Sequence, residues 1–205
     1  MKLKTQLSSG LDELELALED DQLEGLLAYL ELLGKWNKSY NLTAITDPQK
    51  MLSYHLLDSL SIARWFPQGS RVLDVGSGAG LPGIPLAIAL AGRQWTLLDS
   101  NGKKTRFMQQ ALAICAVKNV TVVQSRVEDY HAPESLDIIV SRAYASLGQF
   151  AESVSHLMQP ETVLMTMKTG LEEEALNLTD YDKQEYDLRV PGISEPRKLV
   201  TVRQQ

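Results

Sequence analysis

Hydrophobic and polar positions follow two different periods along this chain of 205 residues. Near the start, leucines recur at helical spacing opposite acidic side chains, which predicts an amphipathic helix. These leucines are Leu23, Leu26, Leu27, Leu30 and Leu33. Asp47 and Pro48 offer an N-cap and a first-turn proline, and they predict a second helix over about 48–64. The segment KWNKSYNLTAIT at 35–46 is polar and turn-forming, and we expect it to connect the two helices.

From residue 71 onward, short apolar runs alternate with helical stretches, which indicates a mostly parallel sheet with helices on both faces. The expected strands are 71–75, 94–98, 120–124, 136–141, 161–167, 184–190 and 198–203. The expected helices are 83–91, 102–116, 146–157 and 171–178. Only a turn at Pro191 and Gly192 separates the last two strands, so they are expected to form an antiparallel hairpin. We therefore expect a helical extension over 1–66 and a doubly wound α/β domain over 67–205.

The segment RVLDVGSGAGLPGIP at 71–85 joins an expected strand to an expected helix and contains a cluster of glycines. Asp74 interrupts the apolar strand just before glycines at 76, 78, 80 and 83. Glycine permits positive φ and a close approach of a ligand to the main chain. A strand, a glycine turn and a helix N-terminus in succession are typical of nucleotide-binding sites.

Two cofactors fit this glycine loop. Gly78, Gly80 and Gly83 satisfy G-x-G-x-x-G, and Asp99 follows at the distance expected for a ribose ligand in an NAD enzyme. Against NAD, Asp74 and Gly76 extend the run to D-x-G-x-G-x-G, which is typical of S-adenosylmethionine (SAM) methyltransferases. The chain also leaves little room for a separate substrate domain. An NAD-dependent oxidoreductase and a non-catalytic RNA-binding assembly module remain the alternatives.

Charge is distributed unevenly along the chain, whose net charge is -6. Residues 35–142 carry 12 basic and 8 acidic side chains, whereas the segments before and after them are acidic. A basic central segment allows an anionic partner despite the acidic total.

Other composition features limit the protein class. The single Cys115 excludes an internal disulfide and is expected to be a buried, inert thiol. The three histidines lack metal-ligand spacing, and no signal peptide or membrane-spanning run is apparent. We therefore expect a cytoplasmic protein with no metal and no membrane partner.

Six segments occur in a characteristic order: KWNKSYNLTAI at 35–45, HLLDSL at 55–60, VLDVGSGAGLPGIPLAI at 72–88, LLDSNGKKTRFM at 97–108, SRVED at 125–129 and VSRAYASL at 140–147. Together they resemble the bacterial glucose-inhibited division protein B family, the small-subunit rRNA guanine-N7 methyltransferase G. The resemblance covers about residues 20–170. It implies a class I SAM-dependent methyltransferase fold, Rossmann-like, with a helical N-terminal extension. It also implies methyl transfer from SAM to N7 of a guanine in the 530 loop of 16S rRNA, free or in a small-subunit particle.

The resemblance also implies roles for individual residues. The cofactor would contact the glycine loop, where the matching positions are Asp74, Gly76, Gly78, Gly80 and Leu81. Asp99 would bind the ribose hydroxyls, Val127 and Glu128 the adenine, and Arg142 would act at the end of the fourth strand. We further expect RNA contacts from Lys35, Lys38, Lys103, Lys104, Arg106 and Tyr144.

Guanine N7 has a lone pair in the ring plane and no proton to lose, so its methylation needs alignment rather than a general base. Arg142 is the candidate catalytic residue, because it can donate to guanine O6, to a phosphate or to the SAM carboxylate. Tyr144 can stack on an extruded guanine. The alternative for Arg142 is an ion pair with Asp74 or Asp137 that braces the strand. For His55 and Asp58, spaced i, i+3, an internal hydrogen bond is favoured over catalysis.

Overall fold

The sheet has seven strands in the order β3-β2-β1-β4-β5-β7-β6 in this computed structural model, which describes residues 2–142, 146–169 and 181–204. The strands are β1 (Arg71–Val75), β2 (Gln94–Asp99), β3 (Val120–Gln124), β4 (Ile138–Ser141), β5 (Val163–Thr169), β6 (Tyr181–Leu188) and β7 (Arg197–Gln204). The first five strands are parallel, and β7 runs antiparallel to both β5 and β6. The predicted parallel sheet and its antiparallel hairpin are therefore confirmed.

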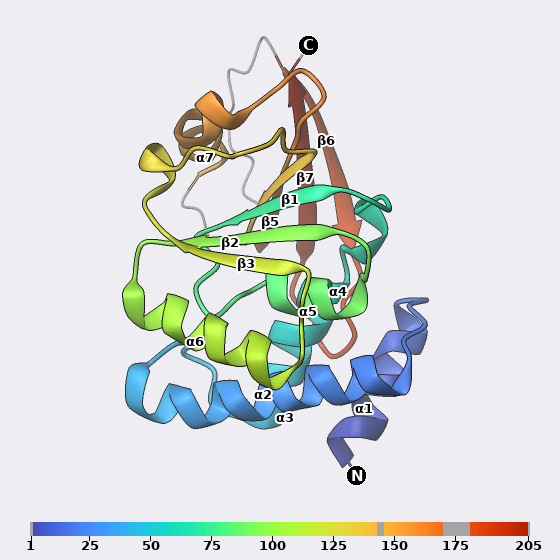
Figure 1. Ribbon diagram of the computed structural model, residues 1–205. Coiled ribbons are helices and arrows are strands. Elements are labelled where there is room, and N and C mark those ends of the chain that lie inside the picture. Colours follow the sequence, from blue (N-terminus) through green and yellow to red (C-terminus); the bar gives the residue numbers. More distant parts are fainter. Residues whose placement is uncertain (1, 143–145, 170–180, 205) are drawn as a thin grey trace.

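Helices cover both faces of the sheet, as Figure 1 shows. One face carries α1 (Lys2–Glu13), α2 (Asp20–Tyr40), α3 (Pro48–Met51), α4 (Asp58–Leu60), α5 (Gly83–Ala89) and α6 (Gly102–Ile114). The other face carries α7 (Leu147–Val154), beside the short 3-10 turns Val127–Asp129 and Ser155–Leu157. No helix among the described residues is long and apolar enough to cross a membrane.

Alternation along β1 divides the core into two hydrophobic clusters. Val72 points into the cluster that contains the helices of the extension, whereas Leu73 and Val75 point into the cluster beneath α7. This alternation follows the two-residue period of a strand. Leu26 and Leu33, two of the leucines that predicted the first helix, are fully buried in the first cluster. The extension thus contributes to the same core as the sheet, and the division at residue 66 stays a prediction.

The segment 35–46 differs from the expectation, because α2 continues through Tyr40. Trp36 packs against the core, with its ring centroid 5.6 Å from that of Phe107, which favours the helical conformation beyond Gly34. The helix ends at Asn41 in the left-handed region, where φ is 50°. The buried Asn37 side chain then accepts a hydrogen bond from Thr43 N at 2.8 Å and fixes the following turn.

The helix predicted over 48–64 is present but irregular. Its Asp47 cap is confirmed, since the Asp47 side chain accepts a hydrogen bond from Lys50 N at 2.9 Å. After α3, the run Leu52–Leu57 is a π-helix, followed by α4 and a 3-10 turn at Ala63–Trp65. The helix predicted at 171–178 lies outside the described residues.

Cys115 follows the last residue of α6 and is half-buried rather than buried. Its Sγ donates to the Gly25 carbonyl of α2 at 3.3 Å. Burial raises the pKa of the thiol to about 11. The thiol is therefore protonated at neutral pH, and its inertness stays a prediction.

Candidate functional site

The glycine loop lies at the carboxyl ends of the parallel strands, where open α/β sheets bind ligands. Gly76 N and Ser77 N both donate to the Leu98 carbonyl, at 2.8 and 3.1 Å. Gly78 N donates to Asp99 Oδ2 at 2.9 Å. These three hydrogen bonds fix the loop after β1 to the end of β2.

The four glycines divide into two pairs with different surroundings. Gly76 and Gly78 have φ values of +67° and +61°, and their missing side chains would point into nearly open space. A Cβ atom on Gly80 would collide with Ile84, and one on Gly83 would collide with Leu97. The first pair therefore leaves backbone open to a ligand, and the second pair allows the loop and α5 to pack closely.

A cavity of about 370 Å³ opens beside Gly76, the first of these glycines. It is lined by Val75, Gly76, Leu98, Asp99, Ser100, Lys104, Ser125, Arg126, Val127, Glu128 and Ser141. The cavity thus brings together four of the residues predicted to bind a cofactor: Gly76, Asp99, Val127 and Glu128. The other five, Asp74, Gly78, Gly80, Leu81 and Arg142, do not line it.

Asp99 is held rigidly at the cavity. Its side chain is 6% exposed, and Oδ1 accepts from Asn101 N at 2.9 Å while Oδ2 accepts from Gly78 N. Lys104 Nζ lies 3.5 Å from Oδ2. A carboxylate has about four lone-pair positions, so these contacts leave acceptor capacity for ligand hydroxyl groups. A carboxylate, open glycine backbone and the apolar Val127 side chain together fit an adenosine moiety.

Asp74 lies beneath the loop and is fully buried. Its Oδ2 accepts from Gly83 N at 2.9 Å, which braces the turn into α5. Its Oδ1 is buried and has no hydrogen-bond partner among the described residues. Burial raises the pKa of this carboxyl to about 7.

Arg142 follows Ser141, the last residue of β4, and its side chain is 23% exposed. Its Nη1 donates to the Tyr54 carbonyl at 3.0 Å and lies 3.5 Å from Asp58 Oδ2. The alternative considered for Arg142, an ion pair, is thus present, but its partner is Asp58 and not Asp74 or Asp137. Asp137 is at the opposite end of the strand, where it accepts a hydrogen bond from Arg71 N at 2.7 Å.

The predicted hydrogen bond between His55 and Asp58 is also wrong. His55 Nε2 is 2.9 Å from Thr43 Oγ1, and Asp58 instead pairs with Arg142 and Arg197. The π-helix widens the turn on which His55 lies, so the α-helical i, i+3 spacing does not apply. Burial and the nearby Arg142 charge lower the pKa of His55 to about 4, and the ring is neutral at pH 7.

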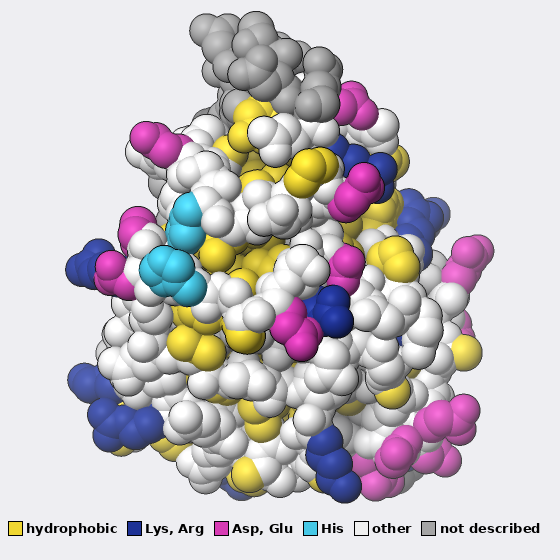
Figure 2. Space-filling view, turned by 45° about the horizontal axis from the view of Figure 1, so that its top comes forward, with side chains coloured by type: hydrophobic (Ala, Val, Ile, Leu, Met, Phe, Trp, Pro, Cys, Tyr) yellow, Lys and Arg dark blue, Asp and Glu magenta, His cyan; other side chains and the backbone are white. Residues whose placement is uncertain are grey.

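The basic residues predicted to contact RNA lie on α2 and α6, which pack against each other. Lys38, Lys103 and Arg106 are exposed, and Lys35 is exposed but paired with Glu31 at 2.7 Å. Figure 2 shows basic side chains at the lower left, on the side where α2 ends and α6 begins, and acidic side chains at the lower right. Tyr144 lies outside the described residues.

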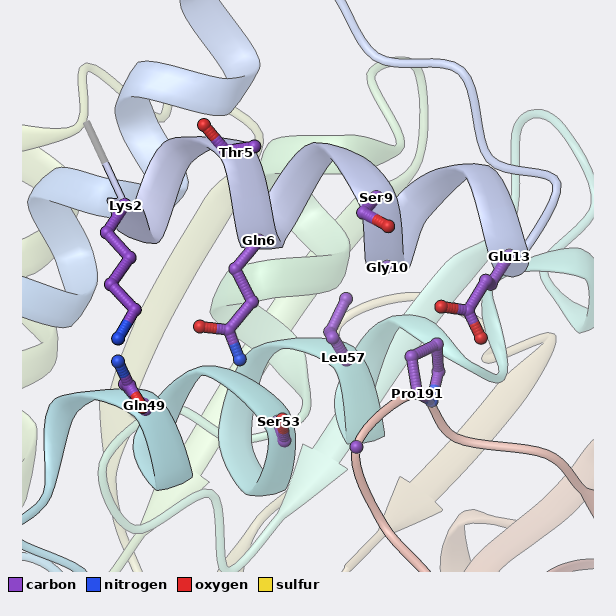
Figure 3. A pocket seen from close by; sticks show the side chains of 11 residues that line it. Lys2, Thr5, Gln6, Ser9, Gly10, Glu13, Gln49, Ser53, Leu57 and Pro191 are labelled. Carbon is purple, nitrogen blue, oxygen red and sulfur yellow. The ribbon is translucent and has the colours of Figure 1, made fainter.

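A larger groove, about 810 Å³, lies away from these residues (Figure 3). It runs between α1, the π-helix and the turn at Pro191 and Gly192. None of the predicted site residues lines it. Among the described residues, no group of three or more His, Cys, Asp or Glu side chains is placed to hold a metal ion.

The sheet order, the glycine loop and the acidic residue that ends β2 define the class of SAM-dependent methyltransferases. The fold is similar to a SAM-dependent methyltransferase from Aquifex aeolicus, with a TM-score of 0.58, 18% identity, and coverage of 76% of this chain and 93% of that one. An rRNA methylase from Streptococcus thermophilus matches with a TM-score of 0.52 and 16% identity, covering 72% and 94%. At these identities the likeness shows the fold.

Sequence comparisons identify the family. Residues 22–200 match the family model described as rRNA small subunit methyltransferase G. Curated relatives named ribosomal RNA small subunit methyltransferase G include one from Pseudomonas aeruginosa strain LESB58, 48% identical across 97% of this chain and 94% of its own. Another, from Coxiella burnetii strain Dugway 5J108-111, is 42% identical across 97% of both chains. The chain belongs to the rRNA small subunit methyltransferase G family. It is a SAM-dependent rRNA methyltransferase, and neither alternative considered above is favoured.

Proposed function

We propose that this chain transfers the methyl group of SAM to N7 of a guanine in the 530 loop of 16S rRNA, in the cytoplasm. The observation that carries this proposal is the cavity that combines the open backbone of Gly76 with the Asp99 carboxylate and with Ser141, the residue before Arg142. The substrate is 16S rRNA, free or within a small-subunit particle.

In the proposed complex, Asp99 binds the ribose hydroxyls, and Val127 and Glu128 bind the adenine. Gly76 and Gly78 lie against the ligand through their backbone. Asp74, Gly80 and Leu81 act from beneath the loop by fixing its shape, which the hydrogen bond from Gly83 N to Asp74 supports. SAM supplies a methyl group on a sulfonium that N7 attacks without a general base.

Arg142 is the proposed catalytic residue. A guanidinium has five N–H donors in a planar fork, which suits guanine O6, a phosphate or a carboxylate. Its Nη1 is turned toward the extension, where it meets Tyr54 and Asp58. This anchoring supports a role in which the guanidinium orients the base and keeps N7 in line with the methyl group.

The proposed cofactor is tested by thermal melting with SAM and with NAD. SAM should raise the melting temperature in a concentration-dependent way, because a ligand that binds only the folded state stabilises it. NAD should leave the melting temperature unchanged. Stabilisation by NAD alone would contradict the proposal.

Asp99→Ala should weaken SAM binding about tenfold or more. It removes a carboxylate proposed to accept two ribose hydroxyl hydrogen bonds, and charge-assisted bonds contribute about 1.5–3 kcal/mol each. Titration calorimetry measures the change, with Asp12→Ala on α1 as an exposed control. Equal SAM affinity in the parent and Asp99→Ala would remove Asp99 from the site.

Exposed cations near the site should give RNA binding a steep salt dependence. Lys104 lines the cofactor cavity, so Lys103 and Arg106, which are exposed, are the better residues to change. The double variant Lys103→Ala, Arg106→Ala should weaken RNA binding and lower the salt slope by about 1 for each phosphate that is no longer neutralised, with SAM affinity retained. Filter binding at several salt concentrations measures both quantities.

The matched control is Lys2→Ala with Lys118→Ala, which removes the same charge from exposed positions on α1 and beyond the end of α6. This control should bind RNA with the slope of the parent. Identical slopes for all three proteins would show that the RNA-binding face lies elsewhere.

A further inference from the structure

Asp58 is a buried carboxylate at the meeting point of three elements that are far apart in the sequence. Its side chain is only 8% exposed, and it starts α4 directly after the π-helix. Arg142, after β4, lies 3.5 Å from its Oδ2, and Arg197, the first residue of β7, lies 3.3 Å from its Oδ1. The helical extension is thereby connected to the strand that leads into the proposed site.

Two guanidinium groups share this one carboxylate, and they differ in exposure. The Arg197 side chain is 9% exposed and also donates to the Pro196 carbonyl at 3.2 Å. The Arg142 side chain is 23% exposed. The Asp58 carboxylate alone cannot balance both cations, and Arg142 is the more exposed of the two. An anchored and partly exposed guanidinium suits an anionic or oxygen-rich ligand.

The backbone around Asp58 is arranged to receive Arg142. Tyr54, within the π-helix Leu52–Leu57, offers its carbonyl to Arg142 Nη1 at 3.0 Å. The Tyr54 hydroxyl donates to both carboxylate oxygens of Glu195 at 3.0 Å, and the Arg197 guanidinium lies 5.7 Å from the centre of the Tyr54 ring. Short π-helical segments occur often at functional sites. The same Nη1 atom is thus held by a carbonyl and a carboxylate from one helix.

We propose that Asp58 is a positioning residue for methyl transfer, which it serves by fixing the Arg142 guanidinium in its working orientation. The proposal rests on the function proposed above for Arg142. Asp58 does not line the cofactor cavity, and in this role it acts through Arg142. The extension thereby takes part in the reaction through the HLLDSL segment, in addition to its packing on the sheet.

The test compares Asp58→Asn with the matched control Asp137→Asn, which makes the same chemical change at the other end of β4. Asp58→Asn should slow single-turnover methylation of small-subunit particles about tenfold to a hundredfold, the range expected when a catalytic group shifts by about 1 Å. The control should react at the parental rate. Circular dichroism and thermal melting show whether each variant is folded at the assay temperature. If Asp58→Asn does not fold, Asp58→Glu replaces it, and the lengthened carboxylate should slow the reaction by displacing Arg142.

A double-mutant cycle separates positioning from a general structural role. In an Arg142→Ala background, Asp58→Asn should cause no further loss of rate, because its effect passes through the guanidinium. Multiplicative losses from the two changes would overturn the proposal, and so would a parental rate in a folded Asp58 variant. If Arg142→Ala itself reacts normally, the function proposed for Arg142 fails. If Arg142→Ala is slow and Asp58→Asn is not, only the inference about Asp58 fails.

Discussion

Replacing Arg142 with alanine should slow single-turnover methyl transfer about tenfold to a thousandfold, the range for removal of one well-placed hydrogen-bond donor in a reacting site. Arg142 is the cation at the end of β4, and its Nη1 is fixed by Tyr54 and Asp58. The variant removes both the positive charge and the donors proposed to orient the guanine. Rapid mixing of enzyme with particles and labelled SAM measures the rate directly.

The fold should survive this change, because Asp58 keeps Arg197 as a partner at 3.3 Å. Arg142→Lys is the informative companion, since it retains the charge but loses the planar fork. It should react faster than Arg142→Ala and more slowly than the parent. Normal methylation by Arg142→Ala, together with a large drop in melting temperature, would show that Arg142 serves only the scaffold.

The free energy of unfolding of Asp74→Asn, relative to that of the parent, should change by about 4 kcal/mol between pH 4 and pH 7. In the unfolded chain this carboxyl loses its proton near its ordinary pKa of 3.8, whereas burial raises the pKa in the folded protein to about 7. Between these values the folded state binds more protons, so Asp74 makes the free energy of unfolding fall as pH rises from about 4 to about 7. At 1.36 kcal/mol per pKa unit, the interval corresponds to about 4 kcal/mol.

Asparagine cannot ionise, and its side-chain oxygen can still accept the hydrogen bond from Gly83 N. The stability of Asp74→Asn relative to the parent should therefore increase from pH 4 to pH 7 and stay constant above that. Urea unfolding at a series of pH values measures the difference. Parallel curves for the two proteins would show that Asp74 ionises normally in the folded state.

His55 titrates in the same pH range, so the stability of Asp74→Asn must be compared with that of the parent at each pH. Its pKa falls from an ordinary 6.5 to about 4 in the folded protein, chiefly because it is buried. The folded state therefore binds fewer protons between pH 4 and 6.5, and this contribution to stability rises with pH. In the parent it opposes the effect of Asp74. In Asp74→Asn nothing from Asp74 opposes the His55 contribution, so the free energy of unfolding should increase with pH over this range.

The sheet could be predicted because each strand leaves a local signal in the sequence. Runs such as Val120–Gln124 coincide with the observed strand, and the glycines after β1 predicted the loop that borders the cavity. Local sequence also favoured SAM over NAD, through Asp74 and Gly76, but left the NAD alternative open. The four glycines could not be assigned different roles from the sequence, because the collisions at Gly80 and Gly83 involve packing across the loop.

The errors concern contacts between distant segments. No local rule connects Asp58 with Arg197, which follows 139 residues later and reaches Asp58 only after the sheet has formed. The same holds for Trp36, whose contact with Phe107 on α6 favours helix where local composition suggested a turn. The sequence did contain one signal for the missed contact. Asp58 lies on the apolar face of HLLDSL, and a buried carboxylate requires a cationic partner.

The central claim is that this chain methylates N7 of a guanine in the 530 loop of 16S rRNA. The most direct measurement incubates the protein and labelled SAM with small-subunit particles from a strain that lacks this gene. The position of 7-methylguanosine is then mapped by borohydride reduction, aniline cleavage and primer extension. We predict about one methyl group per particle and a single cleavage within the 530 loop. No incorporation, or a methyl group on another atom or another region of the rRNA, would contradict the claim.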